Sequence, residues 1–481
     1  VNPQVFETSA STNSATWAFL KRSANVELKS LFPKFLCILC TFFNTQTAYF
    51  CNMNILVLGS GGREHVFASK ISQSPLCSKL FIAPGNAGTA NCGTNLPISP
   101  LDFKAVADAC LNNHIDMIVP GNEDPLVAGI VDFIHSEPSL KHILILGPPK
   151  AGAMLEGSKD YSKAFMKRHN IPTAAYLSVT LDTIQDGYNF LDSLKPPYVL
   201  KADGLAAGKG VLIEADIDQA KRSLMEMLQG KFGQASSTVV IEEFLDGIEM
   251  SCFVLTDGVS YKILPEAKDY KRIGVGDTGL NTGGMGAVSP VPFADSIFLE
   301  KVKTSIVEPT VKGLQNEQID YVGFIFIGLM NCNGVPKVIE YNCRMGDPET
   351  EVVLHRILND HVELYKAACQ KQLHTVELLL DPNHAVTVFL VSGGYPEAFE
   401  KGFPVSGIET VKDATVYQAG TKTENGMVVT NGGRVIAVTA TADTMPKALS
   451  LAMQNADKIQ FNHKYYRQDI GQDLMKYYES I

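Results

Sequence analysis

The order of apolar and polar positions after residue 53 predicts strands that alternate with helices. Four short apolar runs have the length and composition of buried strands, at 54–58, 79–83, 116–120 and 143–147. The stretch at 64–72 has apolar residues at helical spacing, and the glycines at 59–62 before it predict a turn. Strands alternating with helices are typical of a parallel sheet covered by helices. The pattern therefore predicts a Rossmann-like α/β unit at 53–153.

The glycine-rich turn does not complete a dinucleotide-binding motif. The motif G-x-G-x-x-G would place a glycine at position 64, where the chain has Glu64. The next strand ends at Ala83-Pro84 without an acidic residue for a ribose. A helix start that follows glycines still binds phosphate well. We therefore expect an anion at this turn, and the hypothesis of a nicotinamide-dependent oxidoreductase loses its main motif.

A second glycine-rich stretch, VLKADGLAAGKGV at 199–211, combines an apolar strand with a basic loop. Its lysines and loop glycines are Lys201, Gly204, Gly208, Lys209 and Gly210. Glycines let the backbone approach a phosphate closely, and successive N–H groups in such a turn bind anions. The loop is not a Walker A motif, because Gly210 rather than Ser or Thr follows Lys209. It predicts a phosphate-binding loop, with an ordinary glycine-rich hairpin as the alternative.

The segment IEEFLDGIE at 241–249 is an apolar run interrupted by acidic residues. A nucleotide site needs an acidic side chain that accepts from ribose hydroxyls, beside backbone that pairs with the adenine edge. The segment fits that need. A charged hairpin tip is the alternative.

The most informative stretch is VIEYNCRMGDPETE at 338–351. Glu340 and Asn342 stand two residues apart, so they face the same side of a predicted strand, and Arg344 continues that face. Oxygen ligands of this kind suit Mg²⁺, with phosphate filling the rest of its shell. The alternative is an edge strand that runs into a solvated polar turn. We interpret Cys343 as a packing residue that points away from the metal face.

The region from about His384 predicts a further α/β part. Apolar strands are expected in AVTVFLV and in GRVIAVTA at 433–440, followed by a long amphipathic helix at 445–459. This region carries few candidate catalytic groups.

Taken in chain order, Lys159 at a helix start, the loop after Lys201, the segment 242–249, and Glu340 with Asn342 resemble the ATP-grasp superfamily. Longer motifs narrow the resemblance to the glycinamide ribonucleotide synthetase family. They are GSGGREH (59–65), APGNAGT (83–89), LEGSK (155–159), KADGLAAGKGV (201–211), IEEFLDG (241–247), DTGLNTGGMGA (277–287), EYNCRMGDPET (340–350) and TNGGRV (430–435). The resemblance runs from about Met53 to the C-terminus.

The resemblance implies an ATP-grasp fold of the α/β class. An N-terminal Rossmann-like substrate domain is expected at 53–153, and an ATP-grasp domain at 154–380 with a small lid at about 173–243. A C-terminal α+β domain at 381–481 would pack beside the first domain and complete the cleft. A lid that closes over the nucleotide would keep water away from an acyl phosphate.

The reaction implied by the resemblance is a step of purine biosynthesis. ATP would activate glycine as glycyl phosphate, and 5-phosphoribosylamine would capture it to give glycinamide ribonucleotide, ADP and phosphate. Mg²⁺ or Mn²⁺ would bind Glu340 and Asn342, and Arg344 and Lys271 are the expected catalytic residues. The strand at 322–330 has no carboxylate, so the metal site would be looser than in many ATP-grasp enzymes.

The resemblance also assigns binding residues. The expected ATP-binding residues are Lys159, Lys201, Gly204, Gly208, Lys209, Gly210, Glu242, Glu243, Phe244, Leu245 and Glu249. The expected substrate-binding residues are Gly61, Gly62, Arg63, Glu64, Asn86, Gly88, Thr89, Asp269, Gly283, Gly284, Met285 and Asp347. The two lysines would hold the α- and β-phosphates, Glu249 the ribose, and the backbone of 242–245 the adenine. A flexible surface loop is the alternative for the glycines at 283–286.

Composition narrows the function class. Hydrophobic residues at 45% and charged residues at 19% describe an ordinary globular chain, and 481 residues are too many for one core. A net charge of -10 argues against a nucleic-acid surface, which needs basic patches. Only Cys37 and Cys40 have the spacing C-x-x-C, so no zinc site is complete and reduced thiols are expected. We expect small-molecule substrates and no membrane partner, and the family resemblance implies a monomer or weak dimer.

The first 52 residues do not fit the rest of the chain, and we expect no packed domain there. They contain the only tryptophan, Trp17, and an apolar patch at 35–43 that is too short to span a membrane. A poorly formed signal peptide, an organelle transit peptide and upstream sequence read through in a gene model remain open. The location is therefore expected to be cytoplasmic, with an organelle as the alternative.

Two other function classes compete with a ligase. An oxidoreductase would leave KADGLAAGKGV and EYNCRMGDPE without a role. A nucleotide-binding regulator without activity would keep the fold but lose metal or phosphate ligands, and every motif position named above is intact. Within the ligase class, relatives that activate bicarbonate or formate are the nearest alternatives.

Overall fold

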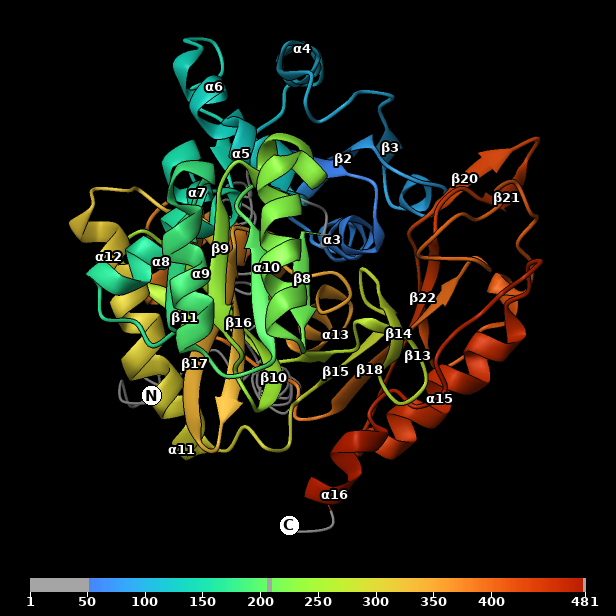
Figure 1. The fold of residues 1–481 in the computed structure, drawn as a ribbon. Coiled ribbons are helices and arrows are strands. Elements are labelled where there is room, and N and C mark those ends of the chain that lie inside the picture. The colour runs from blue at the N-terminus through green and yellow to red at the C-terminus, as the bar shows by residue number, and fades with distance from the viewer. Residues whose placement is uncertain (1–51, 206–209, 479–481) are drawn as a thin grey trace, which may run out of the picture. The chain divides into compact units, whose positions relative to one another are not determined.

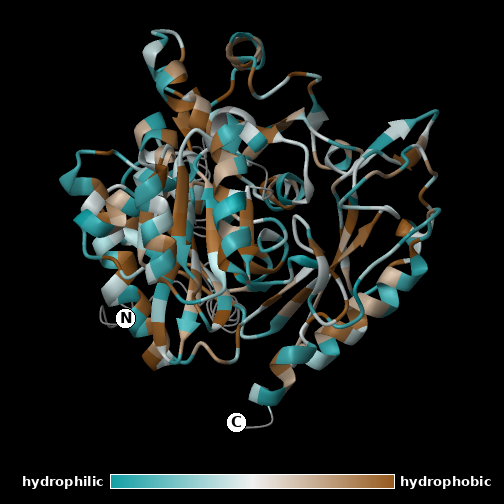
Figure 2. Cartoon of the chain, viewed as in Figure 1, coloured by the Kyte–Doolittle hydropathy of each residue, from teal (hydrophilic) through white to brown (hydrophobic). Residues whose placement is uncertain are grey.

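The computed structural model of the protein describes residues 52–205 and 210–478. The expectations for residues 1–51, and those for Gly208 and Lys209, lie outside the described residues. Within this part of the chain, no helix is both long and apolar enough to cross a membrane. Figure 2 shows hydrophobic residues (brown) concentrated along the strands, whereas the helices mix hydrophobic and hydrophilic positions.

The N-terminal part is a five-stranded sheet in which every strand pair is parallel (Figure 1). In spatial order its strands are β3 (Thr94–Asn95), β2 (Cys77–Pro84), β1 (Met53–Gly59), β4 (Met117–Pro120) and β5 (Leu144–Ile145). Its helices are α3 (Gly62–Ser72), η3 (Thr89–Asn91), α4 (Phe103–Asn113), α5 (Glu123–Ala128), α6 (Ile130–Ser136) and α7 (Lys150–Gly157). All four predicted strands are present. The central strand β1 is apolar throughout because both of its faces are buried: Ile55 and Val57 lie in one core, Leu56 and Leu58 in another.

A small antiparallel sheet with its own core follows α8 (Lys159–Arg168). Its strands, in spatial order, are β6 (Tyr176–Val179), β9 (Val239–Glu243), β7 (Tyr198–Ala202) and β8 (Val211–Glu214). Its helices are η4 (Leu181–Thr183), α9 (Ile184–Ser193), α10 (Ile217–Glu226), η5 (Met227–Lys231) and η6 (Gly233–Ser236). The sheet lies within the range for which a lid is expected, and its closure stays a prediction. Strands β7 and β8, on either side of the glycine-rich stretch, pair as an antiparallel hairpin, and phosphate binding by this stretch stays a prediction.

The four-stranded antiparallel sheet β11-β10-β16-β17 carries the metal-face residues. Its strands are β10 (Ile248–Asp257), β11 (Tyr261–Ile263), β16 (Val322–Cys332) and β17 (Val335–Asn342). The helices α11 (Ser296–Val302), η7 (Lys303–Val307) and α12 (Glu308–Asn316) stand between β15 and β16 in the sequence. Strand β10 alternates between two cores, with Cys252 and Val254 in one and Phe253 and Leu255 in the other. Segment 241–249 joins β9 of the small sheet to β10 of this sheet, so the hairpin-tip interpretation is wrong.

The C-terminal sheet is formed by β12 (Lys268–Asp269), β15 (Gly286–Ser289), β18 (His384–Val391), β22 (Arg434–Ala442) and β19 (Thr415–Gln418), in that spatial order. Helix α15 (Met445–Lys458) packs against β18 and β22 (Figure 1). Two separate hairpins are β13 (Arg272–Gly274) with β14 (Thr278–Asn281), and β20 (Thr421–Glu424) with β21 (Met427–Thr430). Strands β12 and β15 precede residue 380, so this sheet crosses the boundary expected there.

Short helices complete this half of the chain. They are α13 (Thr350–Val353), η8 (Leu354–Arg356), α14 (His361–Cys369), η9 (Leu373–Thr375), η10 (Ile408–Thr410), η11 (Gln472–Leu474) and α16 (Met475–Tyr478). Helix α14 packs on β10 and β16 and also contacts α3.

The first and last parts of the described chain meet where α3 packs on β19. The backbone N–H of Gln418 donates to Nδ1 of His65 at 2.7 Å, and its carbonyl accepts from the amide of Asn86 at 2.7 Å. Burial lowers the pKa of His65 to about 4, so the ring is neutral at pH 7 and Nδ1 can accept. The ring also stacks edge-on against Tyr417, with centroids 5.5 Å apart.

Gly88 lies at this junction and has no room for a side chain. A Cβ there would lie 2.3 Å from Cε1 of His65 and 2.8 Å from Cβ of Gln418. We expect Gly88→Ala to lower the free energy of unfolding by about 1–3 kcal/mol, because buried overpacking displaces its neighbours. Urea unfolding measures this. Ala90→Ser, which adds one atom at an exposed position of the same turn, is the control and should unfold like the wild type. Equal stability of Gly88→Ala and the control would contradict the tight junction.

Candidate active site

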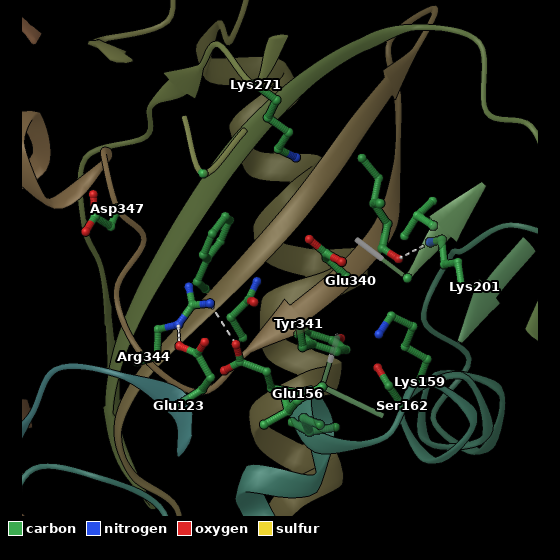
Figure 3. A pocket seen from close by; sticks show the side chains of 18 of the residues that line it. Glu123, Glu156, Lys159, Ser162, Lys201, Lys271, Glu340, Tyr341, Arg344 and Asp347 are labelled. Carbon is green, nitrogen blue, oxygen red and sulfur yellow. Dashed lines mark hydrogen bonds and ion pairs between the residues drawn. The ribbon is translucent and has the colours of Figure 1, made fainter. Parts of the chain in front are cut away.

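A cavity of about 370 Å³ collects both expected catalytic residues, both expected metal ligands and four of the expected ATP-binding residues (Figure 3). The expected residues that line it are Lys159, Lys201, Gly210, Glu242, Asp269, Lys271, Gly283, Glu340, Asn342, Arg344 and Asp347. They come from α8, β7, β9, β12, β17, the end of the loop before β8, and the connections after β12, β14 and β17. The cavity also has lining residues that sequence reasoning missed: Glu123, Asp124, Glu156, Ser162, Lys163, Phe326 and Glu349.

Glu340 and Asn342 face the cavity together, as their spacing in β17 predicts. Among the described residues, no side chain makes a hydrogen bond or ion pair with the Glu340 carboxylate. Figure 3 shows it between Lys271 on one side and Lys159 and Lys201 on the other. Burial raises the pKa of Glu340, but these lysines and Arg344 outweigh burial, so its pKa falls below the ordinary value. The carboxylate is therefore charged and free to bind a cation.

The donors at the end of β17 fit a divalent metal of the Mg²⁺ type. The amide nitrogen of Asn342 is buried without a hydrogen-bond partner, which leaves the amide free to turn its oxygen toward a cation. Opposite the two donors, β16 supplies Gly328 and Phe326, so it adds no carboxylate. No cluster of three or more His, Cys, Asp or Glu able to hold a metal occurs in the part of the chain that the structure describes. A two-donor site of this kind relies on phosphate and water for its other ligands.

Glu242 is held by two lysines of the nucleotide end of the cavity. Its carboxylate oxygens lie 2.9 Å from Nζ of Lys163 and 2.9 Å from Nζ of Lys201. Burial lowers the pKa of Lys163 to about 8, against the pull of Glu242. Lys159 donates to the carbonyl of Gly204 at 3.3 Å and has no carboxylate partner among the described residues. The ammonium of Lys159 is therefore less neutralised by protein carboxylates than that of Lys201, and is more available to a phosphate.

The adenine-edge role expected for the segment 242–245 fits only its second half. Strand β9 is central in its sheet, and Glu242 pairs with Tyr176 on one side and Val199 on the other. Its backbone is therefore used within the sheet, and Glu242 offers its side chain instead. The N–H of Glu243 donates to the carbonyl of Ala175 at 2.9 Å. Phe244 and Leu245 lie beyond the paired strand and keep the adenine role as a prediction.

Arg344 is clamped between two carboxylates rather than free. Its Nε lies 2.9 Å from Glu123 and its second terminal nitrogen 2.7 Å from Glu156 (Figure 3). Burial would lower the pKa of Arg344, but the two carboxylates raise it above the ordinary value. Burial also raises the pKa of Glu123, yet Arg344 and Arg63 outweigh burial and lower it to about 2. Of the five guanidinium N–H donors, the clamp and a 3.4 Å bond to the carbonyl of Met345 leave two for a ligand.

The polar turn after β17 is buried, although β17 is an edge strand. The sheet order places β17 at the edge, as the alternative interpretation held. Thr173 pairs with Val338 along that edge, and Cys343 is only 2% exposed. Both the backbone N–H and the thiol of Cys343 donate to Glu156, at 2.8 and 3.2 Å. Burial raises the pKa of this thiol well above its ordinary value, so Cys343 is not a nucleophile.

Lys271 pairs with Glu249 on the side of Glu340 away from the small sheet. Burial would lower the pKa of Lys271, but Glu249, Asp269 and Glu340 raise it well above the ordinary value. Glu249 does not line the cavity, so its expected contact with a ribose stays a prediction. Asp269 lines the cavity beside Lys271, and burial raises its pKa despite that lysine.

Several residues expected to bind the amine sugar bond to each other at the start of α3. The Glu64 carboxylate accepts from the N–H of Gly61 and from Arg63, which also donates to the carbonyl of Met345. A Cβ at Gly59 or Gly121 would lie 2.5 and 2.1 Å from Glu64 atoms, so these glycines make room for Glu64. The predicted phosphate contact at this helix start therefore rests on the remaining N–H groups, including that of Gly62.

The APGNAGT segment is also an internal network. The side-chain oxygen of Asn86 accepts from the N–H groups of Gly88 and Thr89, at 2.8 and 3.0 Å, and its nitrogen donates to Ser60 and Gln418. Thr89 donates to the carbonyl of Asn86. These side chains position the turn at Ser60, and a direct contact with a substrate stays a prediction.

The C-terminal part contributes Arg434, which contacts two residues that line the cavity and which sequence reasoning underrated. Arg434 lies 2.9 Å from the Asp347 carboxylate and donates to the carbonyls of Gly283 and Asp347 at 2.7 and 2.8 Å. Gly283 is exposed, whereas Gly284 and Met285 are buried, so the surface-loop interpretation holds only for the first of them. The motif TNGGRV contains Arg434 and was the available signal for it.

Three successive parts of the sequence match the three domains of one enzyme family. Phosphoribosylglycinamide synthetase is matched by its N domain over residues 53–156, its ATP-grasp (A) domain over 157–350 and its C domain over 385–473. The chain belongs to the phosphoribosylglycinamide synthetase family. The phosphoribosylamine–glycine ligase of Pasteurella multocida is 45% identical over 424 residues, which are 87% of this chain and 97% of that protein. The family expected from the motifs is thus confirmed.

Solved structures agree with this family. The crystal structure of the phosphoribosylamine–glycine ligase of Thermotoga maritima is similar with a TM-score of 0.75 and 35% identity, over 87% of this chain and 100% of that chain. A biotin carboxylase domain of Hydrogenobacter thermophilus 2-oxoglutarate carboxylase has a TM-score of 0.65 at 15% identity, over 86% and 91% of the chains, a likeness of fold alone. The expected ATP-grasp fold is confirmed, and the oxidoreductase hypothesis is wrong.

One buried carboxylate of this synthetase has no partner. Glu351, in α13, is fully buried, and neither carboxylate oxygen has a hydrogen-bond partner. Burial, helped by the charge of Asp347, raises its pKa well above the ordinary 4.5, although Arg434 and Arg63 oppose this. The folded state therefore holds a proton that the unfolded state has released above pH 4.5, and stability falls as pH rises toward the folded-state pKa.

We expect Glu351→Gln to remove this pH dependence. The wild type should lose up to about 1.4 kcal/mol of unfolding free energy per pH unit above pH 5 from this group, and the variant should not. Urea unfolding at several pH values between 5 and 8 measures the difference. Glu300→Gln, at an exposed position, is the control and should follow the wild type. Parallel pH curves for the wild type and Glu351→Gln would contradict the buried-proton assignment.

Proposed function

We infer that this protein is an ATP-dependent ligase that joins glycine to 5-phosphoribosylamine, giving glycinamide ribonucleotide, ADP and phosphate in purine biosynthesis. The observation that carries the inference is the unpaired Glu340 carboxylate, which lies beside three lysines in one cavity. Residues from all three matched family parts reach this cavity or its wall: Glu123 from the first, Lys201 from the second, and Arg434 from the third. The relatives named phosphoribosylamine–glycine ligase support the choice of substrates.

The nucleotide belongs at the end of the cavity formed by α8 and the small sheet. Lys159 and Lys201 would neutralise the α- and β-phosphates, with Lys163 and Glu242 holding Lys201 in place. The backbone of Phe244 and Leu245 would meet the adenine edge. Glu340 and Asn342 would hold Mg²⁺, or Mn²⁺ in its place, and the bound metal would neutralise phosphate charge.

The reaction consists of two displacements. A carboxylate oxygen of glycine attacks the γ-phosphorus, the bond to the bridging oxygen breaks, and ADP leaves with that electron pair. The amine nitrogen of the sugar then attacks the acyl carbon, the bond to the phosphate oxygen breaks, and the nitrogen loses a proton. Lys271 and the two remaining N–H donors of Arg344 would stabilise the transferring phosphoryl group and the oxyanion.

Positioning and the exclusion of water account for most of the required catalysis. Glycyl phosphate hydrolyses readily, so the cavity must be closed while it exists. The small sheet is joined to the cavity by α8 and by the connection from β9 to β10, which suits the lid movement expected for it. A monomer or weak dimer, and a cytoplasmic location with an organelle as the alternative, stay predictions.

We expect Glu340→Gln to lower kcat for ADP release by at least about a hundredfold, because the substitution removes the charged donor of the two-donor site and keeps the shape. Steady-state kinetics across a range of Mg²⁺ concentrations measure this. Glu317→Gln, which breaks an ion pair with Arg168 outside the cavity, is the matched control. Wild-type turnover by a folded Glu340→Gln protein would contradict the metal assignment.

The reaction itself is tested by omission of substrates. With the full chain, Mg²⁺ and ATP, we expect ADP release only when both glycine and freshly generated 5-phosphoribosylamine are present. Coupled detection of ADP measures this, with alanine and bicarbonate as control acids. Release without the sugar, or with a control acid in place of glycine, would contradict the substrate assignment and leave the ATP-grasp fold untouched.

A further inference from the structure

The segment 268–272, which begins with β12, presents alternate residues to two different surroundings. Asp269 and Lys271 line the cavity, whereas Lys268 and Tyr270 do not. This alternation follows from the two-residue period of a strand, and β12 pairs with β15 through Lys268 and Asp269. The contacts that hold Lys268 and Tyr270 therefore determine where Asp269 and Lys271 lie.

The second set is held by the chain's C-terminal segment, residues 465–473. Asp473 accepts from the hydroxyl of Tyr270 at 2.6 Å and lies 3.1 Å from Nζ of Lys268. That ammonium sits 3.8 Å from the centroid of the Tyr270 ring. Arg467 stacks on the same ring at 5.2 Å. Ile470 is fully buried in the core that also contains Tyr270.

The same segment also holds the hairpin that joins Lys271 to Gly283. Arg467, only 1% exposed, donates to the carbonyl of Arg272 at 3.1 Å and to Asp277 at 2.6 Å. Its other nitrogens bond to Asp469 at 2.8 and 2.7 Å. Asp469 in turn accepts from the N–H of Gly276, at 2.8 Å.

Tyr465, two residues before Arg467, makes a further contact with the hairpin. The hydroxyl of Tyr465 donates to the carbonyl of Ile273 at 2.9 Å. The adjacent Tyr466 points elsewhere, because its hydroxyl bonds to Asp457 of α15. A buried arginine that satisfies groups on both sides of a connection restrains that connection strongly, since leaving its partners unpaired is costly.

We propose that Arg467, Tyr465 and Asp473 are positioning residues that hold Asp269, Lys271 and Gly283 at the end of the cavity that receives glycine and the amine sugar. The substrate identities rest on the proposed function. Lys271 and Lys201 lie on opposite sides of Glu340 (Figure 3), so this restraint acts on the end away from the nucleotide. We therefore expect the C-terminal segment to affect the affinity for glycine and the amine sugar more than the affinity for ATP.

The mildest tests remove one contact each. Asp277→Asn removes the charge that meets Arg467 at an exposed position with φ of 54°, a conformation that Asn tolerates as well as Asp. Tyr465→Phe removes the bond to Ile273. Tyr466→Phe is the matched control, because it removes an equivalent hydroxyl that bonds to α15. Arg467→Lys and Arg467→Met complete the series, with the lysine keeping one charge.

We expect Asp277→Asn and Tyr465→Phe to raise KM for glycine or for the amine sugar about three- to tenfold, with a smaller change in KM for ATP. Arg467→Met should lower kcat/KM for those substrates at least about tenfold, with partial recovery in Arg467→Lys, and Tyr466→Phe should behave as the wild type. Unchanged kinetics in folded Asp277→Asn and Tyr465→Phe, or an equal rise in KM for ATP, would overturn the proposal.

A second measurement does not depend on the substrates. Amide hydrogen exchange of the peptide 271–283 should be faster in Asp277→Asn and Tyr465→Phe than in the wild type and Tyr466→Phe. Unchanged exchange would overturn the restraint even if the wild type proves to be a different ligase. A wild type that releases ADP without glycine or the sugar, with faster exchange in the variants, would instead refute the proposed substrates and keep the restraint.

Discussion

The charged residues around the end of β17 must be neutralised by groups from other parts of the chain, and this requirement constrains how the elements around the cavity pack. A buried ion without a partner is costly, so each charged residue needs an opposite charge or hydrogen-bonding group from another part of the chain. Arg344 therefore draws Glu123 from α5 and Glu156 from α7, and Lys201 is bound to Glu242 of β9. The Arg344 pairs join the end of the antiparallel sheet to two helices of the N-terminal part, and Lys201 links the small sheet to β17 by donating to the carbonyl of Ile339 at 3.4 Å.

The exceptions to this compensation are the groups that a ligand would satisfy. Glu340 has cations around it but no bonded partner, and the Asn342 amide nitrogen is buried without one. Lys159 lacks a carboxylate partner among the described residues. Departures of this kind from local pairing are expected at functional sites, because the missing partner is the substrate or a metal. Glu351 is different, because it lies outside the cavity and a bound proton, rather than a ligand, neutralises its carboxylate.

The C-terminal part has a larger share in the site than its few candidate catalytic groups suggest. Its sheet contains β12 and β15, which the chain supplies from the ATP-grasp range, and Arg434 restrains both Gly283 and Asp347. The segment 465–473 contacts Lys268 and Tyr270, which alternate along the chain with Asp269 and Lys271. The C-terminal part thus helps to position residues of the cavity and supplies few of the groups that would take part in the chemistry.

The sequence by itself determined the local geometry and the family. The two-residue period placed Glu340 with Asn342, the helix start placed Lys159, and long motifs in order identified the synthetase family, because these features depend on neighbours in the chain. The partners of Arg344 lie 221 and 188 residues away, and β15 pairs with β18 across about a hundred residues. Only the tertiary structure decided these pairings, and with them that Arg344 is clamped, that Glu64 fills the glycine turn, and that the polar turn after β17 is buried. Charges and strand edges are satisfied through space, and spacing along the chain carries no record of which distant group will satisfy them.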